Sequence, residues 1–177
     1  MIKHKEQRVG VFVDVANMYH SAKNLHGARL NFKELLEAAV GERRLMRAIA
    51  YAIKSDSEEE VSFFDALDKS GFEVRTKDLQ VFASGSKKAD WDVGITVDAV
   101  SMAPKLDVVV LVTGDGDFVP LVEYLQSRGL LVEVVSFTET TSQRLRDAAD
   151  DMIDLSGDKR RFLLKSRLAM KVRDKHS

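Results

Sequence analysis

The sequence contains no cysteine, and its 177 residues include only 2 proline and 10 glycine residues. The absence of cysteine excludes a disulfide-stabilised scaffold, a thiolate zinc site and a cysteine nucleophile. The scarcity of proline and glycine argues against a low-complexity chain. Neither sign of charge dominates, because 27 Lys and Arg stand against 28 Asp and Glu. This balance excludes a generally basic nucleic-acid binder and a charge-swollen disordered chain.

Long hydrophobic runs are also missing. The most apolar runs, such as residues 108–112, have the length of a strand and fall far short of the ~18 residues of a membrane span. Asp14 interrupts the apolar run near the N-terminus, so no export signal is predicted. The phosphate-binding motifs G-x-x-x-x-G-K-[ST] and G-x-G-x-x-G are absent from the expected places. We therefore expect a cytoplasmic protein with one globular domain and no membrane segment.

Short apolar runs alternate with helix-like segments along the chain. The runs that predict strands cover residues 9–13, 45–53, 72–76, 106–112, 130–137 and 152–155, with a short extension at 79–82. The segments that predict helices cover residues 17–25, 32–40, 55–70, 90–102, 118–127 and 142–149. The central strands are rich in valine and do not alternate with polar residues, which is typical of a parallel sheet covered on both faces. The sequence predicts an α/β fold, a three-layer sandwich with a mostly parallel central sheet.

Several local features of these elements are also predicted. Asn17 is placed to cap the first helix. Residues 83–88 are rich in serine and glycine and are expected to form a loop. The inner face of the helix over 90–102 is expected to carry Val93, Val97 and Val100.

Charge is unevenly distributed between the body and the C-terminus. Residues 159–177 hold eight basic residues and one acidic residue, a net charge of +7, whereas the rest of the chain carries −8. We therefore divide the chain into a domain over residues 1–157 and a basic C-terminal helix or tail over residues 158–177. This segment could be a solvated helix or an electrostatic contact with nucleic acid. Its apolar residues Phe162, Leu163 and Leu168 could instead mediate a homodimer.

Carboxylates follow several of the predicted strands. Asp14 ends the first strand, Asp115 and Asp117 follow the fourth, and Asp90 and Asp92 open the helix after the third. These side chains are expected to converge, because the carboxyl ends of parallel strands meet at one edge of the sheet. Each acid alone could be a helix cap, but like charges near 4 Å repel by roughly 1–4 kcal/mol per pair. A cluster of this kind needs protons or a cation, and oxygen ligands suit Mg²⁺ or Mn²⁺.

The run TGDGD around Asp115 supports a close approach of its backbone. Gly114 and Gly116 are expected to take a positive φ and so bring Asp115 close. The hydroxyl of Thr113 is placed to hold a carboxylate or a water molecule. A cation held with open positions can activate water and bind a phosphate oxygen, so the natural substrate is a phosphodiester. The four histidines show no ligand spacing, and His20 is expected at the surface or in a cap.

A metal-dependent phosphatase is a competing interpretation of these acids. Haloacid-dehalogenase-type phosphatases also place an aspartate after the first strand and acids after a late strand. Their mechanism uses a second acid two residues after the first as proton donor. Ala16 occupies that position here, so the covalent mechanism lacks its donor.

Three sequence motifs occur in a fixed order along the chain. They read VFVDVANMY at 11–19, KKADWDVGITVDAV at 87–100 and VTGDGDFVPLVEYLQSRGLLVEVVSF at 112–137. Together they resemble the NYN domain family, in particular its LabA-like bacterial branch, within the PIN-like nuclease superfamily. The resemblance covers about residues 8–155 and implies a metal-dependent, ribonuclease-like site.

The resemblance also implies roles for individual residues. By position, Asp14 matches the acid after the first strand, and Asn17 matches the polar residue that follows it. Asp92 and Asp98 match the two acids of the helix motif, and Asp115 and Asp117 match the two acids after the late strand. The family's helix motif is Lys-Gly-x-Asp, whereas Lys88 is followed by Ala-Asp-Trp-Asp here. The extra residue leaves either Asp90 or Asp92 as the ligand, and the spacing of the following helix favours Asp92. Asp98 lies about 120° around the helix from Asp92, which favours a supporting role.

Two hypotheses for function follow. In the first, Mg²⁺ or Mn²⁺ held by Asp14, Asp92, Asp115 and Asp117 activates water to cleave single-stranded RNA. The PIN-like resemblance implies a 3′-oxygen leaving group and a 5′-phosphate product. The groups that could contact the substrate or water are Asn17, Thr113, Lys88 and Trp91, whose indole could stack on a base or simply pack the helix. In the second hypothesis, the domain is a LabA-like regulatory module that binds RNA or a protein and cleaves little.

Overall fold

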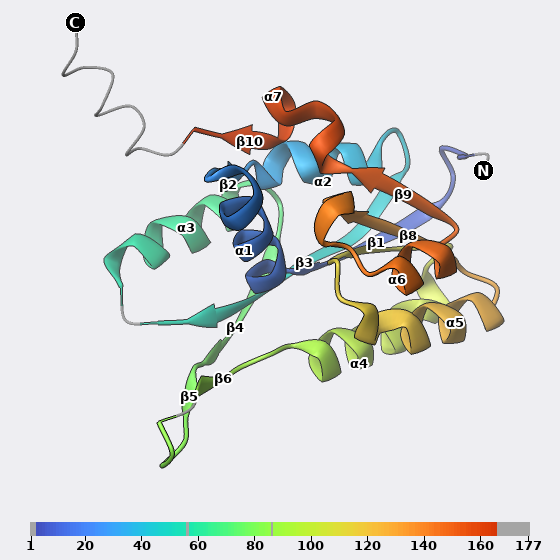
Figure 1. The fold of residues 1–177 in the computed structure, drawn as a ribbon. Coiled ribbons are helices and arrows are strands. Elements are labelled where there is room, and N and C mark those ends of the chain that lie inside the picture. The colour runs from blue at the N-terminus through green and yellow to red at the C-terminus, as the bar shows by residue number, and fades with distance from the viewer. Residues whose placement is uncertain (1–2, 56, 86, 166–177) are drawn as a thin grey trace, which may run out of the picture.

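The computed structural model of the chain describes residues 3–55, 57–85 and 87–165. Its centre is a six-stranded sheet in the order β4-β3-β1-β7-β8-β9, and every neighbouring pair is parallel. The six strands are β1 (Arg8–Asp14), β3 (Arg44–Lys54), β4 (Glu73–Asp78), β7 (Val108–Val112), β8 (Leu131–Ser136) and β9 (Asp151–Asp154). The predicted parallel sheet is thus confirmed, and β1 lies in its middle, between β3 and β7 (Figure 1).

Helices cover both faces of this sheet. One face carries α1 (Val15–His26), α2 (Phe32–Val40) and α3 (Glu58–Lys69), and the other carries α4 (Asp92–Met102), α5 (Val119–Ser127) and α6 (Gln143–Ala148). Side chains of β1 alternate between the two layers. Val11 and Val13 pack toward α1 and α2, whereas Phe12 packs toward α4 and α5. This three-layer arrangement is the one predicted from the alternating pattern.

Short elements complete the fold. They are the strands β2 (Arg29–Leu30), β5 (Gln80–Val81), β6 (Lys87–Lys88) and β10 (Leu163–Leu164), the 3-10 turns η1 (Ala103–Lys105), η2 (Gly116–Phe118), η3 (Thr138–Thr140) and η4 (Leu155–Asp158), and the helix α7 (Lys159–Phe162). The loop expected over residues 83–88 is partly wrong, because β5 and β6 pair as an antiparallel hairpin. This hairpin projects away from the sheet (Figure 1).

The face of α4 that packs on the sheet differs from the prediction. Val93 and Val97 are 75% and 55% exposed, so their predicted burial is wrong. Ile95 and Ala99 are buried instead, at 1% and 0% exposure. Asp98 also turns inward, because it forms polar contacts described below. A count of valines could not detect this, since the helix is oriented by a polar side chain as well as by apolar ones.

The C-terminal segment packs on the domain through the part that the structure describes. The helix predicted there is only four residues long, α7, and the chain continues as β10, which pairs with β2. Phe162 is 4% exposed and belongs to the core, so it is not available for the predicted dimer contact. Leu168 lies outside the described residues, and the division of the chain at residue 157 stays a prediction. Among the described residues, no helix combines the length and apolarity needed to span a membrane.

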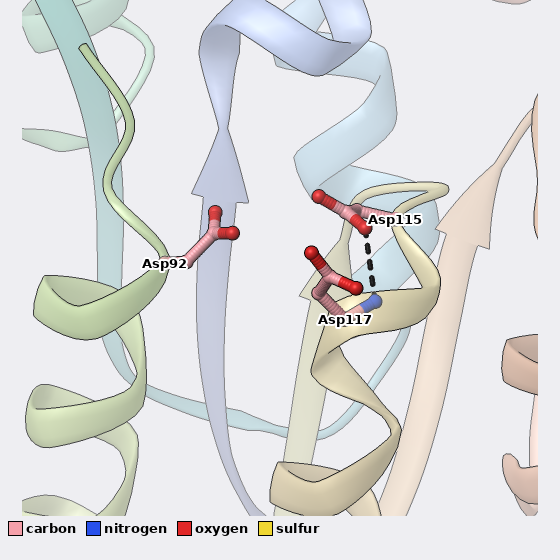
Figure 2. Close-up of side chains that lie close together, drawn as sticks. All are labelled: Asp92, Asp115 and Asp117. Carbon is pink, nitrogen blue, oxygen red and sulfur yellow. Dashed lines mark hydrogen bonds between the residues drawn. The ribbon is translucent and has the colours of Figure 1, made fainter. Parts of the chain in front are cut away.

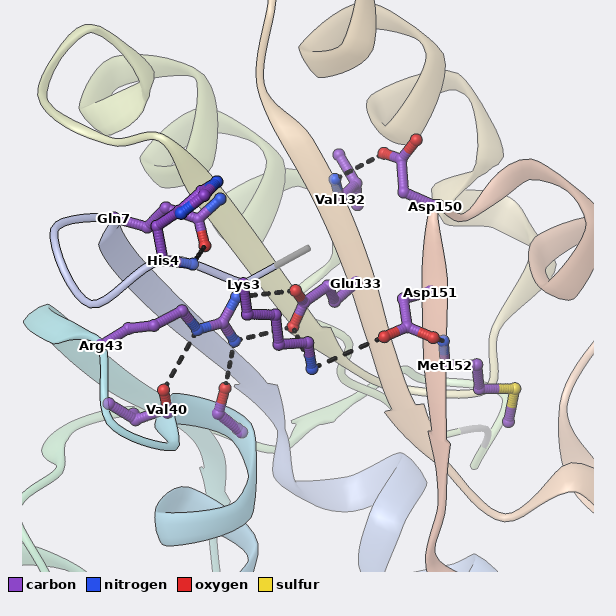
Figure 3. Close-up of polar contacts among 11 residues, drawn as sticks. Lys3, His4, Gln7, Val40, Arg43, Val132, Glu133, Asp150, Asp151 and Met152 are labelled. Carbon is purple, nitrogen blue, oxygen red and sulfur yellow. Dashed lines mark hydrogen bonds and ion pairs between the residues drawn. The ribbon is translucent and has the colours of Figure 1, made fainter. Parts of the chain in front are cut away.

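A buried ion pair joins α2 to the sheet (Figure 3). Arg43 binds Glu133 of β8 through two hydrogen bonds of 2.7 and 2.9 Å, and their side chains are 3% and 1% exposed. Arg43 also donates to the carbonyl oxygens of Ala39 and Val40 in the last turn of α2. The guanidinium therefore satisfies both a buried carboxylate and the C-terminal end of a helix, where positive charge is favourable.

Candidate functional site

Three aspartates from two distant segments meet at the carboxyl edge of the sheet. One carboxylate oxygen from each of Asp92, Asp115 and Asp117 lies within 4.8 Å of the other two. Asp92 begins α4 and points across the end of β1 toward Asp115 and Asp117, which follow β7 (Figure 2). Asp92 opens the helix after the third predicted strand and Asp115 and Asp117 follow the fourth, and the structure brings these acids together as the sequence predicted.

The loop after β7 holds two of these acids in a fixed conformation. Oδ1 of Asp115 accepts a hydrogen bond of 2.9 Å from the N–H of Asp117 (Figure 2). Through this bond Asp115 caps the turn η2. The N–H of Asp115 in turn donates to Oγ1 of Thr113 at 3.2 Å. Thr113 is buried, at 2% exposure. The loop thus holds one half-buried carboxylate, that of Asp115, and one exposed carboxylate, that of Asp117.

Asp14 lies beside this group and is not one of the three clustered acids. It caps α1, because its Oδ1 accepts from the N–H of Asn17 at 3.3 Å, and its Oδ2 accepts from Oγ1 of Thr113 at 3.4 Å. The cap of α1 is therefore Asp14, and the prediction that Asn17 fills this place is wrong. Asn17 instead accepts a hydrogen bond of 2.9 Å from the N–H of Gly114. These contacts join the end of β1 to the end of β7.

The two glycines of the TGDGD run permit close packing, and their predicted positive φ is wrong. Neither Gly114 nor Gly116 is among the described glycines with positive φ. A Cβ on Gly114 would lie 2.8 Å from the carbonyl oxygen of Thr140, and one on Gly116 would lie 2.6 Å from Oγ of Ser142. The loop 137–142 therefore approaches the acidic loop at a distance that only glycine allows.

Polar contacts fix the start of α4, and hence Asp92, on the sheet. The indole N–H of Trp91 donates to the carbonyl oxygen of Ala52 in β3 at 2.8 Å. Two turns later, Asp98 accepts from the hydroxyl of Tyr51 at 2.7 Å and from the guanidinium of Arg75. Asp98 therefore bonds to residues of β3 and β4, and its supporting role at the site stays a prediction.

An open cavity of about 510 Å³ lies over Asp92 and Asp115. Its lining includes Asp14, Asn17, Asp90, Trp91, Asp92 and Asp115. Ala16 and His20 of α1 line it as well, so His20 lies on the wall of the site. Lys88 belongs to β6, and its side chain lies outside what the structure describes.

The sequence as a whole matches one known family. The family model of the NYN domain matches residues 8–156. The chain belongs to the NYN domain family. It is 32% identical over 170 residues to the low amplitude and bright protein LabA of Synechococcus elongatus, covering 92% of this chain and 90% of that protein.

A solved structure of similar sequence shares the NYN fold described above. The crystal structure of a protein of unknown function, VPA0982 of Vibrio parahaemolyticus, superposes with a TM-score of 0.83 at 38% identity. The match covers 93% of this chain and all of that one. The relationship to the LabA-like branch and the α/β architecture predicted from the sequence are thereby confirmed.

Burial, with a contribution from neighbouring negative charges, raises the pKa of two acids in this NYN domain. Burial is the main reason that the pKa of Asp92 rises to about 6, and the nearby charges of Asp115, Asp90, Asp14 and Asp117 add to it. Burial also raises the pKa of Asp14, although its hydrogen bonds from Asn17 and Thr113 act in the opposite direction. A bound cation would relieve this repulsion, because it favours the charged form of every carboxylate near it.

The chemistry of the donor set fits a hard divalent cation. All three clustered groups are carboxylates, the oxygen ligands that such cations prefer. Cation–oxygen distances for Mg²⁺ are about 2.0–2.1 Å, so two oxygens on opposite sides of it lie about 4.2 Å apart. The three oxygens lie within 4.8 Å of one another, a spacing in the range that a shared divalent cation requires.

Several contributors to the site carry no signal in the sequence. Tyr51 and Arg75 lie on strands far from Asp98 along the chain, and neither belongs to a motif. Burial and the bond to Asp98 raise the pKa of Tyr51, so its hydroxyl remains a hydrogen-bond donor at any ordinary pH. The position of His20 could have been foreseen, because it lies one turn after Ala16 and Asn17 on a helix that starts at the site.

Proposed function

We propose that this NYN domain is a metal-dependent nuclease that hydrolyses phosphodiester bonds in single-stranded RNA. The observation that carries the proposal is the cluster of Asp92, Asp115 and Asp117, of which Asp92 and Asp115 line an open cavity. The charges of Asp115 and Asp117 add to the effect of burial in raising the pKa of Asp92, so the charged cluster is costly without a cation. Membership of a nuclease superfamily supports the same chemistry.

Mg²⁺ or Mn²⁺ is the proposed cofactor, with Asp92, Asp115 and Asp117 as ligands and Asp14 beside them. Such a cation supplies Lewis acidity, which favours deprotonation of water and neutralises charge on a phosphate. Asp14 faces the same cavity, and its raised pKa suits a group that takes a proton from the attacking water. Attack on phosphorus breaks the bond to the 3′-oxygen and leaves a 5′-phosphate.

The residues around the acids have positioning roles in this proposal. Asn17 and Thr113 hold the acidic loop against the end of β1 through the bonds described above. Asp90 is exposed at the rim and adds negative charge near Asp92. Asp98 holds α4 on the sheet through Tyr51, and Trp91 does so through Ala52. These contacts keep Asp92 aimed at the acidic loop.

A cleavage assay tests this function. The purified protein is incubated with 5′-labelled single-stranded RNA and either Mn²⁺ or Mg²⁺, with and without EDTA. The decisive variant is Asp115→Asn, because the amide oxygen can still accept the bond from the N–H of Asp117 while the ligand charge is lost. Asp68→Asn, an exposed position on α3, is the matched control.

Three outcomes separate the hypotheses. Metal-dependent cleavage that is lost in Asp115→Asn and kept in Asp68→Asn supports the nuclease. Cleavage that survives Asp115→Asn contradicts it and indicates a contaminant. Absence of cleavage, with cation binding still measured by calorimetry, rejects the enzyme and favours a regulatory RNA- or protein-binding module.

A further inference from the structure

The outer surface of α1 continues directly from the wall of the carboxylate cavity. Ala16, Asn17 and His20 line that cavity from α1. Tyr19 and Lys23 lie on the adjoining exposed surface of the same helix. Tyr19 is 44% exposed, a large fraction for an aromatic ring. This surface, composed of Tyr19, His20 and Lys23, is called here the α1 platform.

Tyr19 lies at the centre of the α1 platform, beside both His20 and Lys23. The rings of Tyr19 and His20 meet edge to face, with centroids 5.5 Å apart and an angle of 77°. The ammonium of Lys23 lies 6.0 Å from the centre of the Tyr19 ring. The core side of α1 is made by Val15, Met18 and Ala22 instead, so the platform is not needed to bury the helix.

The opposite wall of the cavity has less ring surface to offer. The indole N–H of Trp91 donates to the carbonyl oxygen of Ala52, and its ring packs against that of Tyr51 at a centroid distance of 5.3 Å. The ammonium of Lys77 lies 4.7 Å from its ring centre, and Gly94 approaches the ring so closely that a Cβ would lie 2.5 Å from it. These contacts favour the interpretation of Trp91 as packing for α4.

The charge of the cavity determines what can bind beside it. Among the described residues that line the cavity, four are aspartates and none is lysine or arginine. A polyanion must therefore gain affinity from groups next to the acids. Base stacking supplies affinity that does not depend on contacts between phosphates and cations of the cavity lining, and Lys23 adds a positive charge on the same side.

We propose that the α1 platform binds unpaired bases of a single-stranded nucleic acid whose backbone crosses the carboxylate cavity. This inference deepens the proposed nuclease function and rests on it for the identity of the strand. An unpaired base can stack on Tyr19, whereas the bases of a duplex are already stacked and paired. The platform therefore selects single strands over duplexes of the same sequence.

Binding is measured by fluorescence anisotropy with a labelled single-stranded RNA 12-mer in Mg²⁺. All proteins carry Asp115→Asn, which prevents cleavage during the measurement. Tyr19→Ala is expected to weaken binding by about tenfold, because loss of one base–aromatic stack costs that order of affinity. Tyr19→Phe keeps the ring and is expected to bind like the parent. Tyr124→Ala, on α5 and 46% exposed, is the matched control with unchanged affinity.

The outcomes distinguish failure of the platform from failure of the nuclease. Equal affinity of Tyr19→Ala and the parent, or no measurable binding of single strands, overturns the platform. Equal binding of the RNA duplex and the single strand also overturns it. Loss of affinity in Tyr19→Ala supports the platform even where the protein with Asp115 intact does not cleave RNA, a result that would reject only the nuclease.

Discussion

The side-chain oxygen of Asn17 accepts a hydrogen bond from the backbone N–H of Gly114 at 2.9 Å. This bond links the first turn of α1 to the acidic loop after β7, two segments separated by 97 positions in the chain. It sets the place of Asp115 relative to Asp14, since Asp115 follows Gly114 directly and Asp14 accepts a hydrogen bond from the N–H of Asn17. The geometry of the site therefore depends on a side chain that contributes no charge.

Replacing Asn17 with alanine is expected to cost stability and cation affinity together. The N–H of Gly114 is buried and would lose its partner, which costs about 1–3 kcal/mol. The acidic loop would also be less firmly held, so Mn²⁺ binding measured by calorimetry should weaken. Asn24→Ala, at an exposed position of the same helix, is the control in urea unfolding and calorimetry. Equal values for both variants would show that the bond does not order the site.

The raised pKa of Asp92 predicts a dependence of stability on pH in the metal-free protein. This carboxyl titrates near pH 6 when folded and near 3.8 when unfolded, so the folded state binds more protons between these values. The free energy of unfolding contributed by protonated Asp92 is therefore lost as pH rises from about 4 to above 6. Asp92→Asn is expected to raise Tm in EDTA at pH 7.5, and the gain should shrink toward pH 4.

Thermal unfolding with and without Mg²⁺ checks this prediction. Added Mg²⁺ should raise the Tm of the parent protein at pH 7.5 more than that of Asp92→Asn, because binding to the folded state stabilises it. A Tm difference in EDTA that stays constant from pH 4 to 7.5 would contradict the assigned titration.

Gly114→Ala is expected to destabilise the fold by about 1–3 kcal/mol, because the added Cβ would lie 2.8 Å from a backbone oxygen. The strain should also displace the acidic loop and reduce cleavage. Gly157→Ala is the matched control, because a Cβ there meets nothing within 4 Å. Urea denaturation compares the two, and similar midpoints for both would refute the tight packing of loop 137–142.

Removal of one partner from the ion pair between Arg43 and Glu133 is expected to cost about 3–5 kcal/mol, since it leaves a buried charge unpaired. Glu133→Leu is the informative single change, and the double variant with Arg43→Met should recover part of the loss, because methionine removes the unpaired charge but cannot donate to the carbonyl oxygens of Ala39 and Val40. Cation affinity of the refolded variants should not change, because the pair does not line the carboxylate cavity. A double variant no more stable than Glu133→Leu would argue against the role assigned to the pair.

Most of the architecture is visible in the sequence because it depends on local patterns. Apolar runs of strand length alternate with amphipathic segments, and the rule that parallel strands end at one edge brings Asp92 and Asp115 together. The sheet and the layers follow from these patterns. The clustered acids were found for the same reason, since each stands directly after a strand or at the start of a helix.

What the sequence did not reveal depends on contacts between distant segments. The rotation of α4 is fixed by Asp98 meeting Tyr51, 47 positions earlier, so the exposure of Val97 could not be read from periodicity. The conformation of Gly114 is likewise set by Thr140, which approaches from another loop. In both cases the deciding partner, Tyr51 or Thr140, is remote in the chain and belongs to no sequence motif that would identify it.

The central place of β1 in the sheet has a consequence for synthesis. Asp14 and Thr113, which adjoin the ends of β1 and β7, are separated by 99 positions. At a translation rate of roughly 5–20 residues per second, β1 waits about 5–20 s for its second neighbour to emerge from the ribosome. During this time one edge of a valine-rich strand is unpaired, and such edges invite aggregation. The nascent chain should therefore need a chaperone to cover this edge until β7 has been synthesised.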